Sequence, residues 1–159
     1  MYELSDGGGS TLVSDGKVVG KTASAGYQIG VRRTLPISKE QAWSFLTSSE
    51  GVRIWLGEVA EVAFAQGARF ASSEGITGEF RVVKPLEQLR LRWGKKEWAK
   101  PSTVQIRLLG NDPDRTTISF HQENLDHAST REQMKQHWED VLNTIQQQTI
   151  VADRGEESR

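Results

Sequence analysis

The chain has 159 residues and a formal net charge of −1, with 20 lysines and arginines against 21 aspartates and glutamates. This length is enough for one domain with its own core, and the charge provides no overall field that would attract nucleic acid or an anionic membrane. Because the sequence has no cysteine, it excludes disulfides, thiolate metal ligands and cysteine nucleophiles.

The first 26 residues are rich in glycine, serine, aspartate and lysine. Such a composition offers too little apolar surface to offset the entropy of ordering, so we predict a flexible N-terminal segment over residues 1–26. It contains no apolar stretch of the signal-peptide type, and no run in the chain is long enough to cross a bilayer. We therefore expect a cytoplasmic protein without membrane insertion.

A strand followed by two short helices opens the folded part. Apolar and polar residues alternate over Tyr27–Thr34, which is the period of a half-buried strand. Ser38 and Gln41 have the spacing of a capping box, which predicts a first helix. A second short helix is expected over Ser49–Leu56, with Gly57 as its stop.

Between residues 58 and 124 the chain reads as short strands separated by turn residues. The predicted strands are Glu58–Phe64, Ala68–Ser73, Ile76–Lys84, Gln88–Gly94, Ser102–Leu109 and Arg115–Glu123. Short connections of this kind join antiparallel neighbours. Several strands alternate strictly between apolar and polar residues, so the sheet should have one buried face and one solvated face.

A long amphipathic helix ends the domain. Ser129 and Glu132 form a second possible capping box, and apolar residues then recur at helical spacing to about Ile150. The apolar stripe consists of Met134, Trp138, Val141, Leu142 and Ile145. Residues 27–151 therefore make up the domain, and residues 152–159 are predicted to be a charged tail.

This order of elements predicts an α+β domain in which a curved antiparallel sheet of about seven strands wraps the C-terminal helix. The helix is the only element long enough to cover the apolar face of the sheet, and the two short helices can close one end. Because a twisted sheet and a straight helix are not fully complementary, space for a ligand can remain between them.

The ordered set of motifs resembles the START-like or SRPBCC superfamily, and within it the branch of homologues of the activator of the ninety-kilodalton heat-shock-protein ATPase. The motifs are RTLP at 33–36, SEGVRIWLG at 49–57, LRLRW at 89–93, TTISFHQENL at 116–125 and REQMKQHWEDVL at 131–142. The resemblance implies a helix-grip fold with an internal apolar cavity. It implies no reaction, because the superfamily mixes carriers, receptors and enzymes.

The expected ligand site is the cavity between the sheet and the C-terminal helix. Its candidate lining residues are Trp55, Phe70, Phe80, Leu91, Trp93, Ile106, Phe120, Met134 and Trp138. Trp98, in the loop of residues 95–101, is the candidate gate together with the helix over Ser49–Leu56. Tryptophan suits such a site because it provides apolar area and one N–H donor.

No residue pattern indicates catalysis. The three histidines, His121, His127 and His137, lack the spacing of a metal pair on one helix face, and no serine lies in a nucleophile-elbow pattern. We therefore expect no catalytic residue, no metal and no cofactor.

Five arginines occupy outward strand positions: Arg32, Arg81, Arg90, Arg92 and Arg107. They could form a basic patch for an acidic partner, but we favour cross-strand pairing with Glu79, Glu61 or nearby glutamines, and expect no nucleic acid partner.

Three hypotheses about function remain open. The leading one is a non-enzymatic domain that binds an apolar or amphipathic small molecule. The second is a protein-interaction module that regulates a chaperone, the heat-shock-protein ATPase of the family name. The third is a cyclase-like or hydrolase-like enzyme that uses the cavity.

Overall fold

The computed structural model describes residues 21–22 and 26–157, with side chains over residues 26–150, as one antiparallel sheet and three helices. The strands are β1 (Lys21–Thr22), β2 (Gly26–Leu35), β3 (Arg69–Ala71), β4 (Ile76–Lys84), β5 (Gln88–Lys95), β6 (Ser102–Leu109) and β7 (Thr116–Leu125). The helices are α1 (Lys39–Leu46), α2 (Ser49–Trp55) and α3 (Ala128–Glu157). The strand order is β1-β2-β7-β6-β5-β4-β3, so the first long strand lies beside the last.

The two short helices form where the sequence predicts them. The Ser38 hydroxyl accepts a hydrogen bond from the backbone N–H of Gln41, and the Gln41 side chain accepts one from the backbone N–H of Ser38, which completes the capping box of α1. The Ser48 hydroxyl caps α2 by accepting a hydrogen bond from the backbone N–H of Gly51. A Cβ at Gly51 would lie 1.9 Å from the carbonyl oxygen of Phe45, so only glycine lets the two helices approach so closely.

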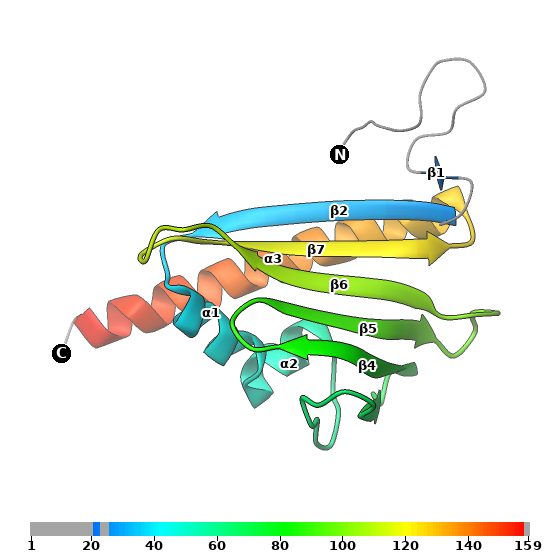
Figure 1. Cartoon of the computed structure of the whole chain (residues 1–159), viewed down its shortest axis with the longest axis horizontal. Helices are drawn as coiled ribbons and strands as arrows, with labels where there is room; N and C mark the ends of the chain where they lie inside the picture. The colour runs from blue at the N-terminus through cyan, green and yellow to red at the C-terminus, as the bar shows by residue number, and fades with distance from the viewer. Residues whose placement is uncertain (1–20, 23–25, 158–159) are drawn as a thin grey trace, which may run out of the picture.

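Helix α3 runs across one face of the sheet (Figure 1). It packs chiefly against β2, with smaller contacts to α2 and β7, and polar contacts fasten it to β2. The Arg33 guanidinium donates to the side-chain oxygens of Asn143 and Gln146, at 2.8 and 2.7 Å. Arg131 Nε donates to the carbonyl oxygen of Gln28 at 2.7 Å. The helix-grip fold of the sequence analysis is thereby confirmed.

The predicted strand over Glu58–Phe64 is wrong, because this segment is irregular. Its apolar residues Val59, Val62 and Phe64 pack against the core without a strand partner. The seventh strand is instead β1, which pairs with the start of β2 inside the segment predicted to be flexible. The rest of that segment, residues 1–20 and 23–25, lies outside the described residues.

Helix α3 is longer than predicted. It begins at Ala128, one residue before Ser129, and extends beyond Ile150 to Glu157, so most of the predicted charged tail has a helical backbone. Over the described residues, no helix is long and apolar enough to cross a membrane.

Candidate ligand-binding site

The nine predicted lining residues all lie in one buried core between α3 and the sheet. Trp93, Phe120 and Trp138 are among the largest fully buried side chains, as is Trp55. The apolar stripe of α3 is buried as predicted, from Met134 to Ile145. The structure therefore brings the nine residues together, although their role as ligand contacts stays a prediction.

Aromatic rings at one end of this core form a continuous group. The Trp138 ring stacks on Phe120, with centroids 4.8 Å apart and planes at 17°. Trp93 lies 5.8 Å from Trp138 and makes an edge contact with Trp98, at 5.5 Å. His137 contacts the Trp138 ring edge-on, at 4.6 Å. Trp98 is thus the outermost ring of a group that leads into the centre of the core.

A buried chain of hydrogen bonds runs through the same region. Trp138 Nε1 donates to Gln122 Oε1 at 2.7 Å, and Gln122 Nε2 donates to Ser102 Oγ at 2.8 Å. The Ser102 hydroxyl donates in turn to the carbonyl oxygen of Trp93, at 2.7 Å. Gln122 is fully buried, and the chain satisfies its amide on both sides. Sequence analysis missed Gln122; its inward position in the alternation of β7 was the available signal.

Two other buried nitrogens have no partner among the described residues. They are Nε1 of Trp93 and Nε2 of His137, and their rings lie 6.2 Å apart. Burial lowers the pKa of His137, and the nearby Lys95 charge lowers it further, while Asp140 acts in the opposite direction. Both effects favour the neutral form of His137.

A pocket of about 240 Å³ opens beside this group. It is lined by the loop after β5, by the end of β7 and by the first turn of α3. The lining residues are Glu97, Trp98, Ala99, Lys100, Asn124, Leu125, Asp126, His127 and Thr130. None of the nine predicted residues lines this pocket, whereas the candidate gate Trp98 does. Trp98 therefore separates the pocket from Trp93 behind it.

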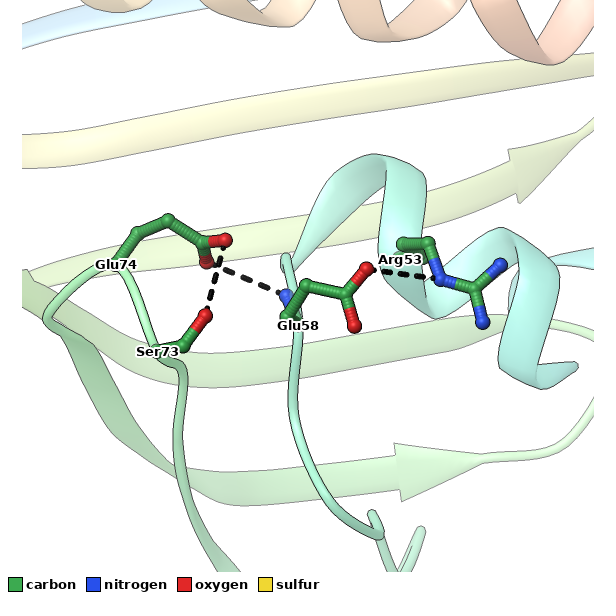
Figure 2. Close-up of polar contacts among 4 residues, drawn as sticks. All are labelled: Arg53, Glu58, Ser73 and Glu74. Carbon is green, nitrogen blue, oxygen red and sulfur yellow. Dashed lines mark hydrogen bonds and ion pairs between the residues drawn. The ribbon is translucent and has the colours of Figure 1, made fainter.

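The other predicted gate element, α2, is tied to the turn between β3 and β4. Figure 2 shows the Glu74 carboxylate accepting from the backbone N–H of Glu58 at 3.3 Å, and from the Ser73 hydroxyl at 3.2 Å. The Glu58 N–H is the main reason that the pKa of Glu74 lies below its ordinary value. Arg53 of α2 forms an ion pair with Glu58 at 3.1 Å. These exposed contacts tie the end of α2 to the turn between β3 and β4, and the role of α2 and of Trp98 as a gate stays a prediction.

The described residues contain no group of three or more histidine, aspartate or glutamate side chains that could hold a metal ion. His121 lies on the outward face of β7, with its Nε2 at 3.2 Å from Gln28 Oε1. His127 is exposed at the rim of the pocket. The histidines therefore do not converge on one site.

Comparison with known proteins gives the family. The model of Activator of Hsp90 ATPase homolog 1-like proteins matches residues 36–148. The chain belongs to this family. Its place in the START-like superfamily, which the sequence motifs predict, is thereby confirmed, and no match was found among curated proteins.

Solved structures with the same fold include three that cover most of this chain. The protein MLL2253 from Mesorhizobium loti is 21% identical, with a TM-score of 0.67 and coverage of 80% of this chain and 97% of that chain. The Hsp90 activator PFC0360w from Plasmodium falciparum is 20% identical, with a TM-score of 0.66 and coverage of 79% and 96%. DynU16, from the dynemicin biosynthetic locus, is 21% identical, with a TM-score of 0.64 and coverage of 73% and 44%, so this chain spans less than half of DynU16. At these identities the likeness establishes the fold.

Proposed function

We propose that this domain binds an amphipathic small molecule at the Trp98 end of the space between α3 and the sheet. One observation carries the proposal: Trp93 Nε1 and His137 Nε2 are both buried without a partner among the described residues, on rings 6.2 Å apart, and the Trp93 ring contacts Trp98, which lines the pocket. Leaving a buried polar group unpaired costs about 1–3 kcal/mol. A ligand atom that pairs with these nitrogens would recover that free energy.

The two nitrogens indicate the chemistry of the ligand. An indole N–H can only donate, and Nε2 of a neutral histidine donates in one of its two tautomers. A carbonyl or carboxylate oxygen is therefore the atom to which both can donate. The positive charge of Lys95, which acts on His137, favours a carboxylate. Trp93 and Trp138 of the predicted lining lie at this end and would contact the apolar part of the molecule.

Entry of such a ligand would require movement of Trp98. The pocket of about 240 Å³ is smaller than the usual range of about 300–1,000 Å³ for ligand sites. Displacing the Trp98 ring would open the pocket to the Trp93 ring, which Trp98 contacts at 5.5 Å. The loop that carries Trp98 lies outside the sheet ladder, so its displacement breaks no strand pairing.

Titration of the protein with aromatic and medium-chain carboxylic acids, followed by tryptophan fluorescence, tests the proposal. Trp93→Phe keeps an aromatic ring but removes the donor, so it should weaken binding about five- to tenfold. Trp98→Ala should speed association, because it removes the gate. Trp43→Phe, which changes a partly buried tryptophan of α1, is the matched control and should leave the affinity unchanged.

The proposal fails if no acid gives a saturable signal in the wild-type protein. It fails equally if Trp93→Phe and Trp98→Ala bind as Trp43→Phe does. In the first case the two nitrogens would be satisfied by water alone, which is the ordinary solution for buried polar groups in a protein interior.

Regulation of a chaperone ATPase is the second candidate function, and the match to the family model favours it. The test is the ATP hydrolysis rate of the ninety-kilodalton heat-shock protein of the same organism, with and without this protein. A saturable rise in the rate would support this function, and an unchanged rate together with no detectable complex would exclude it. Addition of a bound carboxylic acid would show whether the two functions are linked.

A further inference from the structure

The face of the sheet opposite α3 carries a cluster of arginines, which we call the outer arginine face: Arg32, Arg90, Arg92 and Arg107. Ser119 of β7 lies between Arg32 of β2 and Arg107 of β6 in the sheet register. Arg90 and Arg92 are two residues apart on β5, so they point to the same side. All four side chains are exposed.

These arginines have no partners within the described part of the chain. The ion pairs formed there are Arg53–Glu58 and Arg131–Glu132, both away from this face. Glu79 lies in register between Arg92 and Arg69, yet it forms no ion pair with either. The cross-strand pairing that we favoured from the sequence is therefore wrong. Four guanidinium groups with five donors each remain open to a partner.

The surroundings of the arginines suit carboxylates. Ser119, Thr103 and Gln105 lie between them in the sheet register and provide hydroxyl and amide donors. Neighbouring strands are about 4.8 Å apart, and alternate residues of one strand are about 7 Å apart. The carboxylates on one side of an extended acidic peptide have the same spacing of about 7 Å. Arginines on the sheet can therefore contact successive carboxylates of such a peptide. Arginine pairs with carboxylates through two parallel hydrogen bonds.

A nucleic acid fits this face less well. No tryptophan, tyrosine or phenylalanine occupies an outward position on β5, β6 or β7, so bases have no stacking platform there.

We propose that the outer arginine face docks an acidic segment of a partner protein, in a contact separate from the ligand site. The two sites lie on opposite faces of the sheet, so each can be tested without the other. The test measures binding of a fluorescent oligoglutamate peptide by anisotropy. A single-stranded DNA oligonucleotide of similar charge is measured in parallel.

The variant Arg90→Gln/Arg107→Gln removes two charges from the face. It should weaken oligoglutamate binding about fivefold or more at low ionic strength. The matched control, Arg115→Gln/Lys135→Gln, makes the same change in net charge at exposed positions off this face, and should change affinity less than twofold. Because the four residues are exposed, both variants should keep the wild-type melting temperature, which circular dichroism verifies.

The inference is overturned if the wild-type protein does not bind oligoglutamate, or if the two double variants bind it equally. It is also overturned if the DNA binds as tightly as the peptide and loses affinity in parallel, since the face would then be a general polyanion surface. Conversely, Arg90→Lys/Arg107→Lys should bind more tightly than the glutamine variant and less tightly than wild type, because lysine keeps the charge but not the fork of donors.

Discussion

Burial and the neighbouring Lys95 charge hold the pKa of His137 below its ordinary value, and burial does the same for His121. The unfolded chain has no such constraint, so below about pH 6.5 it binds protons that the native protein resists. The contribution of these neutral histidines to the free energy of unfolding should therefore reach its full value above that pH. It should fall as the pH drops from the unfolded pKa to the lower folded pKa.

His137→Gln removes one of these titrating groups, so its unfolding free energy should fall less steeply than that of the wild type as the pH drops below about 6.5. Urea unfolding at a series of pH values measures this slope. His127→Gln, which changes an exposed histidine, serves as the control and should follow the wild-type curve. Parallel curves for His137→Gln and wild type would mean that His137 is protonated as easily in the native state as in the unfolded chain.

At the residue level, alternation predicted which side chains would be buried but not which polar atoms would be paired. Trp138 and Trp93 were both expected in the core, and both are fully buried. That Trp138 Nε1 has Gln122 as its partner while Trp93 Nε1 has none depends on rotamers and on distances across the sheet. A one-dimensional pattern carries no such information, which is why the chemistry of the candidate site emerged only from the structure.

Strand pairing between β4 and β5 depends on the absence of a side chain at Gly78. A Cβ there would lie 2.0 Å from the carbonyl oxygen of Arg92 and 2.4 Å from Cζ of Phe70. The backbone oxygen belongs to the paired strand and cannot move alone, and Phe70 is buried against Phe80 at 5.5 Å. This glycine thus allows the edge of the sheet to close over the core.

Gly78→Ala should lower the free energy of unfolding by about 1–3 kcal/mol, the usual cost of overfilling a packed site. Chemical denaturation checks the value. Thr77→Ala, one residue away and exposed, should cost less than about 1 kcal/mol. If the two substitutions cost the same, the close approach of β4 to β5 at Gly78 would not exist.

Most elements were predictable, and the main exception is instructive. Ser38 with Gln41, and the strict alternation of β5 to β7, each led to the observed element. The segment over Glu58–Phe64 has a similar apolar spacing, but its Val59, Val62 and Phe64 reach the core from an irregular backbone. An apolar pattern in the sequence indicates that side chains are buried. It does not show that the backbone of the segment is hydrogen-bonded to a neighbouring strand.

For the molecule as a whole, family membership and fold followed from motifs spread along the chain, whereas the location of the candidate site followed only in part. The sequence indicated the buried face of the sheet and singled out Trp98, which lines the pocket. It did not indicate that the described pocket lies outside the nine predicted residues, because its walls come from a loop and from the junction of β7 with α3. The shape of such a junction is set by backbone angles, including a positive φ at Asn124, which no periodicity encodes.

The placement of β2 beside β7 also bears on how the chain is made. During synthesis the first long strand leaves the ribosome early, yet its long pairing partner, Thr116–Leu125, emerges only after β3 to β6. Until then the neighbouring strands β4, β5 and β6 can pair with one another. The edge of β2 that later pairs with β7 still has unpaired backbone groups, and the apolar face of β2 is uncovered. Contacts such as that between Gln28 and Arg131, 103 residues apart, close last. A chain with this topology is therefore expected to fold slowly relative to a helical bundle and largely after translation, so a nascent chain stalled before Thr116 is the form most exposed to aggregation.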